Sequence, residues 1–335
     1  MKAINEQHGD DWTMYHGDCV DVVRQLPECS IDYGIHSPPF ANLFIYSDSE
    51  ADMGNCATTA EFIQHYEFLI GELYRTTVVG RLCSVHCKDL PKYGNRDGTT
   101  GLFDFPGMIV GAFERAGWSF HSRVTVWKCP VVERERTNNN GLLHKTIKRD
   151  SSQVRQGMAD YLLTFRKPPV GTLMSEKPIV RPNGLEHYIG EEDPRLPNQP
   201  KHPSPYSRTS SRDPALAIWQ RYAEPVWWDI DQMDVLNYRQ ARSERDERHI
   251  CPLQLGLIER AVELWSNPDD VVLSPFGGVG SEGVGSLRRG RKFVGVELKK
   301  EYFDSACKNL AIAERKSKRV EKTLFDAVET SCEKQ

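Results

Sequence analysis

Hydrophobic positions along the first 130 residues alternate between the spacing of helices and that of strands. Apolar residues recur at helical spacing in 20–26, 59–74 and 105–116. Strand patterns flank these stretches at 12–15, 31–35, 82–87 and 120–127. Because strands and helices alternate, the pattern predicts an α/β fold with a mainly parallel, doubly wound sheet.

The last third of the chain shows the same alternation. Helices are predicted at 253–265, 283–289 and 302–315, with strands at 271–273 and 292–297. The region between differs, because ten of the twenty prolines fall between Pro168 and Pro214 and basic residues gather ahead of them. We interpret this region as an insertion with an extended linker.

Composition and charge narrow the choice of partners. The chain has 335 residues, and 43 Lys and Arg against 47 Asp and Glu give a net charge of −4. A polyanionic partner would therefore need a local basic surface. The insertion offers a run of basic residues that suits either such a contact or a solvated face: Arg134, Arg136, Lys145, Lys148, Arg149 and Arg155.

Cysteines and hydropathy indicate the compartment. The nine cysteines, with no signal peptide ahead of them, are expected to be reduced thiols of a cytoplasmic protein. No apolar run approaches the ~18–20 residues that cross a bilayer, so no membrane association is expected.

A glycine-rich loop indicates a nucleotide-type cofactor. Gly278-Val279-Gly280-Ser281-Glu282-Gly283 has GxGxxG spacing between a predicted strand and a helix, and Glu297 ends the next strand. Glycines let the backbone approach a ligand, and a carboxylate in this place accepts hydrogen bonds from ribose hydroxyls. The spacing fits both a dinucleotide and S-adenosylmethionine.

The late position of this loop favours the second cofactor. Too few residues follow Gly283 to complete a dinucleotide sheet, so the remaining strands must come from earlier in the chain. If 12–18 is the third strand and 31–35 the fourth, the sheet is a circularly permuted, Rossmann-like methyltransferase sheet. Asp18 would then lie beside the adenine of the cofactor.

A rigid loop follows the strand at 31–35. Ser37-Pro38-Pro39-Phe40 carries two prolines, which cannot continue a sheet ladder. The carboxyl edge of an open α/β sheet is where such folds bind ligands. This tetrapeptide resembles the signature of the DNA amino-methyltransferases, which has Asp, Asn or Ser, then two prolines and an aromatic residue.

The resemblance extends along most of the chain in the β-class order, with the catalytic motif first, a target-recognition insertion next and the cofactor motif last. The segment from Arg248 to Gln254, the stretch from Ser274 to Ser281 and Gly295-Val296-Glu297 are similar to the family's cofactor motifs. Trp127-Lys128 is similar to the end of a motif that walls the base pocket. The cofactor residues that the family pattern and the glycine loop predict are Asp18, Pro252, Gln254, Ser274, Phe276, Gly278, Gly280, Ser281 and Glu297.

The resemblance implies direct methyl transfer from S-adenosylmethionine to an exocyclic amine of a flipped DNA base. Ser37 and the Pro38 carbonyl would accept hydrogen bonds from the amine, with Pro39 keeping the loop rigid and Phe40 stacking on the base. Ser37 in place of Asp or Asn favours N4 of cytosine over N6 of adenine, although His36 stands where the family usually has Thr. Ser274 replaces the family's usual Asp, which puts one cofactor contact in doubt.

The expected organisation follows from this order. Residues 1–130 would form the catalytic half, 131–245 the target-recognition insertion and linker, 246–315 the cofactor half and 316–335 a charged tail. Double-stranded DNA is the expected partner, with a restriction endonuclease as a further one. The alternatives are a nicotinamide-dependent oxidoreductase and a DNA-binding module without turnover.

Other chemistry-bearing residues receive weaker interpretations. Cys83, His86 and Cys87, with Cys129, have spacing that suggests metal ligands, but strand residues alternate between faces and no metal is expected. His8 and His16 receive no role. Trp219, Arg221, Tyr222, Trp227 and Trp228 suit DNA contact, but packing of the insertion on the sheet is favoured. Asp52-Met53-Gly54-Asn55 suits a flap over the target base or a plain turn.

Overall fold

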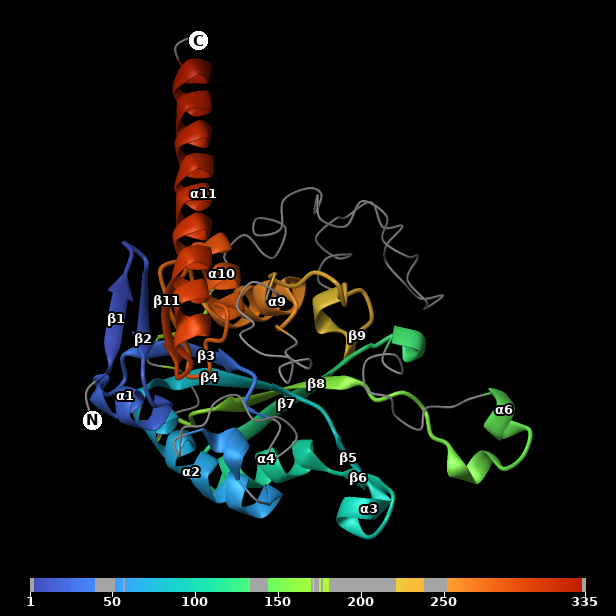
Figure 1. Cartoon of the computed structure of the whole chain (residues 1–335). Coiled ribbons are helices and arrows are strands. Elements are labelled where there is room, and N and C mark those ends of the chain that lie inside the picture. Colours follow the sequence, from blue (N-terminus) through green and yellow to red (C-terminus); the bar gives the residue numbers. More distant parts are fainter. Residues whose placement is uncertain are drawn as a thin grey trace.

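The structure is a computed structural model that describes most of the chain. Its described residues are 3–39, 52–56, 58–132, 144–169, 171, 175, 177–180, 221–237 and 252–332. Within them lies one large mixed α/β unit, as the sequence predicts (Figure 1).

A nine-stranded sheet forms the centre, in the order β1-β2-β11-β10-β3-β4-β8-β7-β9. Its strands are β1 (Asn5–His8), β2 (Trp12–His16), β3 (Ile31–His36), β4 (Thr77–Cys87), β7 (Ser119–Val126), β8 (Asp160–Arg166), β9 (Val226–Trp227), β10 (Val271–Ser274) and β11 (Lys292–Glu297). The run β2-β11-β10-β3-β4 is parallel throughout, whereas β8 is antiparallel to both of its neighbours. The sheet is therefore mostly parallel.

Helices cover both faces of this sheet. One face carries α1 (Cys19–Gln25), α2 (Thr59–Thr76) and α4 (Phe105–Arg115), and the other carries α9 (Leu255–Trp265), α10 (Ser281–Arg288) and α11 (Lys300–Cys332) (Figure 1). Each set buries its apolar stripe in its own core cluster against the sheet. Short elements lie at the rim: β5 (Leu90–Lys92), β6 (Gly101–Phe103), α3 (Gly94–Asp97), α6 (His144–Ile147) and the 3-10 turns Met53–Asn55 and Ser151–Gln153.

Strands from the two ends of the chain meet in the middle of the sheet. β10 and β11 lie between β2 and β3, and β11 pairs with β2 in parallel from Phe293↔Trp12 to Glu297↔His16. The strands on either side of the glycine loop therefore pair with strands from the start of the chain, as its late position predicts. That the order is a circular permutation stays an interpretation.

The sheet changes winding direction between β10 and β3. The helix after β10, α10, covers one face, and the helix after β3, α2, covers the other. The loops that leave these two adjacent strands therefore diverge. Open α/β sheets bind ligands at this kind of crevice.

Two stretches differ from the sequence prediction. β8 and β9 fall within 131–245 yet belong to the main sheet, so part of the predicted insertion is core. The apolar run of β8 is short and ends at charged residues, and the proline-rich surroundings hid it. The predicted charged tail is also helical as far as Cys332, because α11 continues past 315 through lysine, glutamate, arginine and other residues that favour helices.

The helices of the described residues differ from those that span a bilayer. None of them combines the length and the apolar character that such a helix requires.

Candidate active site

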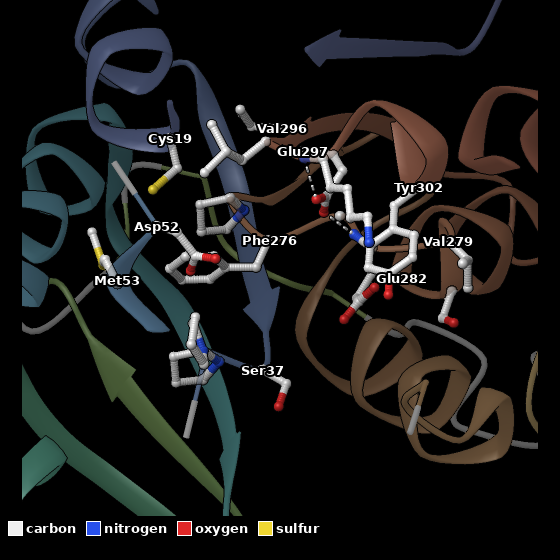
Figure 2. A pocket seen from close by; sticks show the side chains of 18 of the residues that line it. Cys19, Ser37, Asp52, Met53, Phe276, Val279, Glu282, Val296, Glu297 and Tyr302 are labelled. Carbon is white, nitrogen blue, oxygen red and sulfur yellow. Dashed lines mark hydrogen bonds between the residues drawn. The ribbon is translucent and has the colours of Figure 1, made fainter. Parts of the chain in front are cut away.

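The loops after four parallel strands line one cavity at the carboxyl edge of the sheet. Gly17 and Asp18 follow β2, Ser37 follows β3, Pro275 follows β10 and Leu298 follows β11. Figure 2 shows Phe276 near the middle of the cavity wall, with Cys19, Asp52 and Met53 on one side and Glu282, Glu297 and Tyr302 on the other.

The cavity gathers most of the residues that the sequence singled out. Those that line it are Asp18, Ser37, Pro38, Pro39, Pro252, Phe276, Gly278, Ser281 and Glu297. Ser274, Gly280 and Gln254 are each next in sequence to lining residues but do not line the cavity themselves. Phe40 lies outside the described residues, as does the segment from Arg248 to Cys251.

The glycine loop and Glu297 hold each other in place. One carboxylate oxygen of Glu297, Oε2, accepts a hydrogen bond from the Gly278 N–H at 2.8 Å, and Oε1 accepts one from the Lys299 N–H at 2.8 Å (Figure 2). Gly278 and Gly280 have φ of 51° and 89°, a left-handed conformation that glycine adopts without strain. Burial raises the pKa of Glu297 to about 7, although the two N–H donors oppose the rise.

Several polar atoms near the cavity are buried without a hydrogen bond. Among the described residues they include Ser274 Oγ, Ser281 Oγ and Gln254 Oε1. Native proteins rarely leave buried polar atoms unsatisfied. Since Ser281 lines the cavity, its hydroxyl is suitably placed to contact a polar ligand there.

Glu282 is the lining residue that sequence reasoning missed most clearly. Its side chain is buried, and burial with the nearby charge of Glu297 raises its pKa to about 8. No cation among the described side chains pairs with it. The residue lies inside the glycine motif, but loop spacing alone does not say which side chain of the first helical turn faces the ligand.

The Asp52 turn is the second addition. Asp52 accepts a hydrogen bond from the Gly54 N–H at 2.8 Å, and Asp52 and Met53 both line the cavity. The turn therefore forms part of the cavity wall, and a role as a flap over the target base stays a prediction. The remaining lining residues were not singled out individually, although five of them fall inside the predicted cofactor motifs: Gly17, Cys19, Leu253, Pro275, Gly277, Val279, Val296, Leu298, Lys299 and Tyr302.

Asp18 and His16 support the walls of the cavity. Asp18 caps α1, its Oδ1 accepting a hydrogen bond from the Asp21 N–H at 2.9 Å. His16, which received no role from sequence, lies 3.0 Å from the Leu298 carbonyl through Nε2 and stacks on Phe303. These contacts fix the loops that follow β2 and β11.

Ser37 lies at one end of a chain of buried polar groups. Its Oγ is 3.2 Å from His86 Nδ1 and 3.3 Å from the His86 carbonyl. His86 Nε2 is 3.0 Å from Asp160 Oδ2, and Lys128 Nζ is 2.7 Å from the same oxygen. Sequence reasoning considered His86 only as a metal ligand, and no group of three potential metal ligands occurs among the described residues.

His36, the residue before Ser37, is fully buried. Burial lowers its pKa to about 3, so it is neutral, and its Nε2 lies 2.6 Å from the Tyr66 hydroxyl. This contact anchors the end of β3 to α2, which fixes the point at which the loop begins.

The aromatic residues of the insertion do not form one cluster of a single kind: one is buried in the core, and others are held by hydrogen bonds to glutamates. Trp227 is only 1% exposed and stacks on Trp265, which confirms the packing interpretation for this residue. Tyr222 and Trp228 are held by Glu263 and Glu224 at 3.4 and 2.8 Å. Trp219 lies outside the described residues.

Comparison with known proteins identifies the family. The model of the N6/N4 methyltransferase family, described as DNA methylase, matches residues 31–308. The type II methyltransferase M.BglII of Bacillus subtilis is 24% identical over 298 residues, which cover 88% of this chain and 67% of that protein. This relative and four others are matched over between 22% and 67% of their own length.

Solved structures share the fold. A protein described as a DNA modification methylase from Thermus thermophilus superposes with a TM-score of 0.58 at 20% identity, covering 90% of this chain and 94% of its own. The cytosine-N4-specific PvuII DNA methyltransferase gives 0.52 at 14% identity, covering 94% and 96%. Because the family model spans most of the chain and the fold agrees, this protein belongs to the N6/N4 DNA methylase family, the S-adenosylmethionine-dependent methyltransferases that act on amino groups of DNA bases.

Proposed function

We propose that this protein methylates an exocyclic amino group in double-stranded DNA, and that N4 of cytosine is its target. The observation that carries the proposal is that Ser37 and Pro38 line the same cavity as Glu297 and the glycine loop. The residues that we assign to catalysis and to the cofactor therefore lie together, although they come from opposite ends of the chain.

The cofactor end of the cavity suits S-adenosylmethionine. We assign the ribose hydroxyls to Glu297, whose two oxygens have capacity beyond their backbone donors, and the adenine to the wall at Asp18. Pro252, Phe276 and Gly278 would enclose the methionine end, with Ser281 as a hydroxyl donor. When bound, the cofactor supplies an electrophilic methyl group on its sulfonium.

We also assign Ser274 and Gln254 to the cofactor. Both are buried and each carries an oxygen without a partner, but neither lines the cavity directly. We propose that they act on the cofactor indirectly, either through the adjacent lining residues or through a bridging water. Gly280 acts through the backbone, since it caps the first turn of α10.

The amine end consists of the proline loop. An exocyclic amine donates its N–H groups, and the Ser37 hydroxyl and Pro38 carbonyl are acceptors at the cavity wall. Holding the amine this way orients its nitrogen toward the methyl group, and orientation is the main source of rate in a direct transfer. Phe40 keeps its predicted role of stacking on the flipped base.

The target base rests on Ser37. Its hydroxyl in place of a carboxylate or amide favours cytosine, and the similar PvuII enzyme is described as cytosine-N4-specific. N6 of adenine is the alternative. The same proposal includes binding of duplex DNA and a restriction endonuclease as a partner. It also gives a target-recognition role to the part of 131–245 that lies outside β8 and β9.

Transfer of a tritiated methyl group from S-adenosylmethionine to DNA from a methylation-free host tests the proposal. Ser37→Ala is expected to lower the transfer rate at least ~100-fold, because the amine loses its acceptor, while the cofactor Kd stays unchanged. Ser119→Ala, at the exposed start of β7, is the matched control and should keep full activity. Cofactor binding without any transfer by the folded wild-type protein would instead favour the DNA-binding module, and binding of NAD in its place the oxidoreductase.

A further inference from the structure

Ser37, His86 and Asp160 form a line of hydrogen-bonding groups that leads from the cavity wall into the protein. They come from three places: the end of β3, the end of β4 and the start of β8. His86 is 7% exposed and Asp160 6% exposed. Adjacent strands β4 and β8 pair in register next to them, which fixes the geometry of the line.

The charge state of Asp160 determines the tautomer of His86. Although burial alone would raise it, the hydrogen bond to His86 and the positive charges of His86, Lys128 and Lys88 hold the pKa of Asp160 well below its ordinary range. An ionised carboxylate only accepts hydrogen bonds, so His86 Nε2, 3.0 Å away, must carry the hydrogen. In the neutral form of the ring, Nδ1 is then the acceptor, and it lies 3.2 Å from Ser37 Oγ.

Lys128 shares the Asp160 carboxylate with His86. Its Nζ lies 2.7 Å from the same Asp160 oxygen that faces His86, and its side chain is 5% exposed. Lys128 therefore offsets part of the negative charge that Asp160 presents to the ring of His86.

We infer that Ser37, His86 and Asp160 form a proton relay for the methylated amine, an inference that rests on the proposed methyl transfer. When the amine nitrogen bonds to the methyl carbon, the electron pair of the breaking carbon–sulfur bond stays on sulfur, and the nitrogen carries a positive charge until it loses one hydrogen. Ser37 Oγ takes up that proton while its own proton passes to His86 Nδ1. Asp160 stabilises the resulting imidazolium, which later returns the proton to water.

The hydroxyl proton of Ser37 has two possible acceptors, and both are compatible with the proton transfer described above. Ser37 can also donate to the His86 carbonyl, at 3.3 Å. In either position the hydroxyl keeps lone pairs for the amine N–H. His86 is thus a positioning residue and relay that acts through Ser37 rather than on the base itself.

The first test uses the wild-type protein and no activity. Nitrogen-15 NMR of histidine-labelled protein is expected to show His86 as the Nε2–H tautomer with an unprotonated Nδ1. An Nδ1–H tautomer would overturn the relay, because Nδ1 would then have no lone pair for the serine proton. This result is independent of whether the protein methylates DNA.

The second test measures single-turnover methyl transfer to unmethylated DNA as a function of pH. His86→Asn keeps an acceptor near the position of Nδ1 but cannot take up a proton, so the rate should fall about 100-fold and its acidic limb should disappear, with the cofactor Kd unchanged. Lys128→Met should move the acidic limb to higher pH, since the freed charge of Asp160 then favours the imidazolium form of the ring before the reaction.

The matched control is His121→Asn. His121 lies on β7 and also contacts a serine hydroxyl, Ser122 Oγ at 3.0 Å, but is exposed. It should leave the rate and the pH profile unchanged. An active wild type whose His86→Asn variant keeps both its rate and its acidic limb would overturn the relay and leave the proposed function standing, whereas a wild type without methyl transfer would overturn the proposed function.

Discussion

At the scale of single residues, the cavity holds two carboxyl groups, those of Glu282 and Glu297, that burial keeps protonated to unusually high pH. It also holds the hydroxyl of Ser37, which contacts with His86 orient. Burial raises the pKa of Glu282 to about 8 and that of Glu297 to about 7, from an ordinary 4.5. A buried carboxyl without a cation is stabilised when a positively charged ligand arrives. S-adenosylmethionine carries its positive charge on sulfur and on its amino group.

Cofactor binding should therefore release protons. A cation in the cavity lowers the pKa of both carboxyls, so the affinity for S-adenosylmethionine should rise between about pH 6 and pH 8. Calorimetry in buffers of different ionisation enthalpy counts the protons. Glu282→Gln should reduce their number and flatten the pH dependence, whereas Glu67→Gln, in the exposed pair with Arg115, should change neither.

The same groups make an opposite contribution to folding. Their folded pKa values lie above the unfolded ones, so they favour folding fully below about pH 4.5, and this stabilisation is lost as pH rises towards 8. An affinity that is equal at pH 6 and pH 8, or proton release that Glu282→Gln leaves intact, would contradict the role given to these carboxyls.

At the scale of elements, a buried charge cluster fastens three strands at the edge opposite the cavity. Arg81 of β4 pairs with Asp270 just before β10 and donates to the Asp32 carbonyl of β3 at 2.9 Å. Lys177 lies 2.8 Å from both Asp32 and Asp270. The cluster sets β3, β4 and β10 relative to each other, and these are the strands whose other ends carry Ser37, His86 and the glycine loop.

Removing one charge from this cluster should destabilise the protein. Asp270→Asn leaves the fully buried Arg81 without its anionic partner, and breaking a buried pair in this way typically costs about 3–5 kcal/mol. Urea denaturation followed by circular dichroism measures the loss. Arg115→Ala removes an exposed pair with Glu67 and should change the unfolding free energy by less than about 1 kcal/mol. A similar effect of both variants would contradict the role of the cluster.

The elements that could be predicted from sequence are those with a clear apolar period or a marked end. β3, α2, α4 and β11 agree with the predicted ranges to within two residues. The two helices bury one face and expose the other, whereas β3 is buried throughout and is marked by the double proline that follows it. β8 was missed, since a strand covered on both faces has no alternation and seven residues are too few to stand out. Two-residue β9 has no pattern at all.

Some residues of the site could likewise be predicted from sequence and others could not. Backbone motifs such as the proline loop and the glycine turn could be predicted because they need particular residues at fixed spacing. Glu282 and His86 could not, because their roles depend on which strands and loops lie together: His86 meets Ser37 and Asp160 only after three separate segments pair. No local pattern carries that information.

At the scale of the whole molecule, the fold brings the two ends of the chain to one cavity. β10 and β11, from the last third, lie between β2 and β3, so that the glycine loop and the proline loop line the same cavity. A family model that spans residues 31–308 agrees with this joint use of both ends. The net charge of −4 leaves DNA binding to a local surface rather than to the overall field.

The identity of the methylated base is the most direct test of the proposed function. Unmethylated DNA is incubated with the protein and S-adenosylmethionine, digested to nucleosides and analysed by mass spectrometry, with Ser37→Ala in parallel. The expected product is N4-methylcytosine, absent from the reaction with the Ser37→Ala variant. N6-methyladenine would contradict the assignment of cytosine to the Ser37 hydroxyl, and no methylated base in either reaction would contradict methyl transfer to DNA.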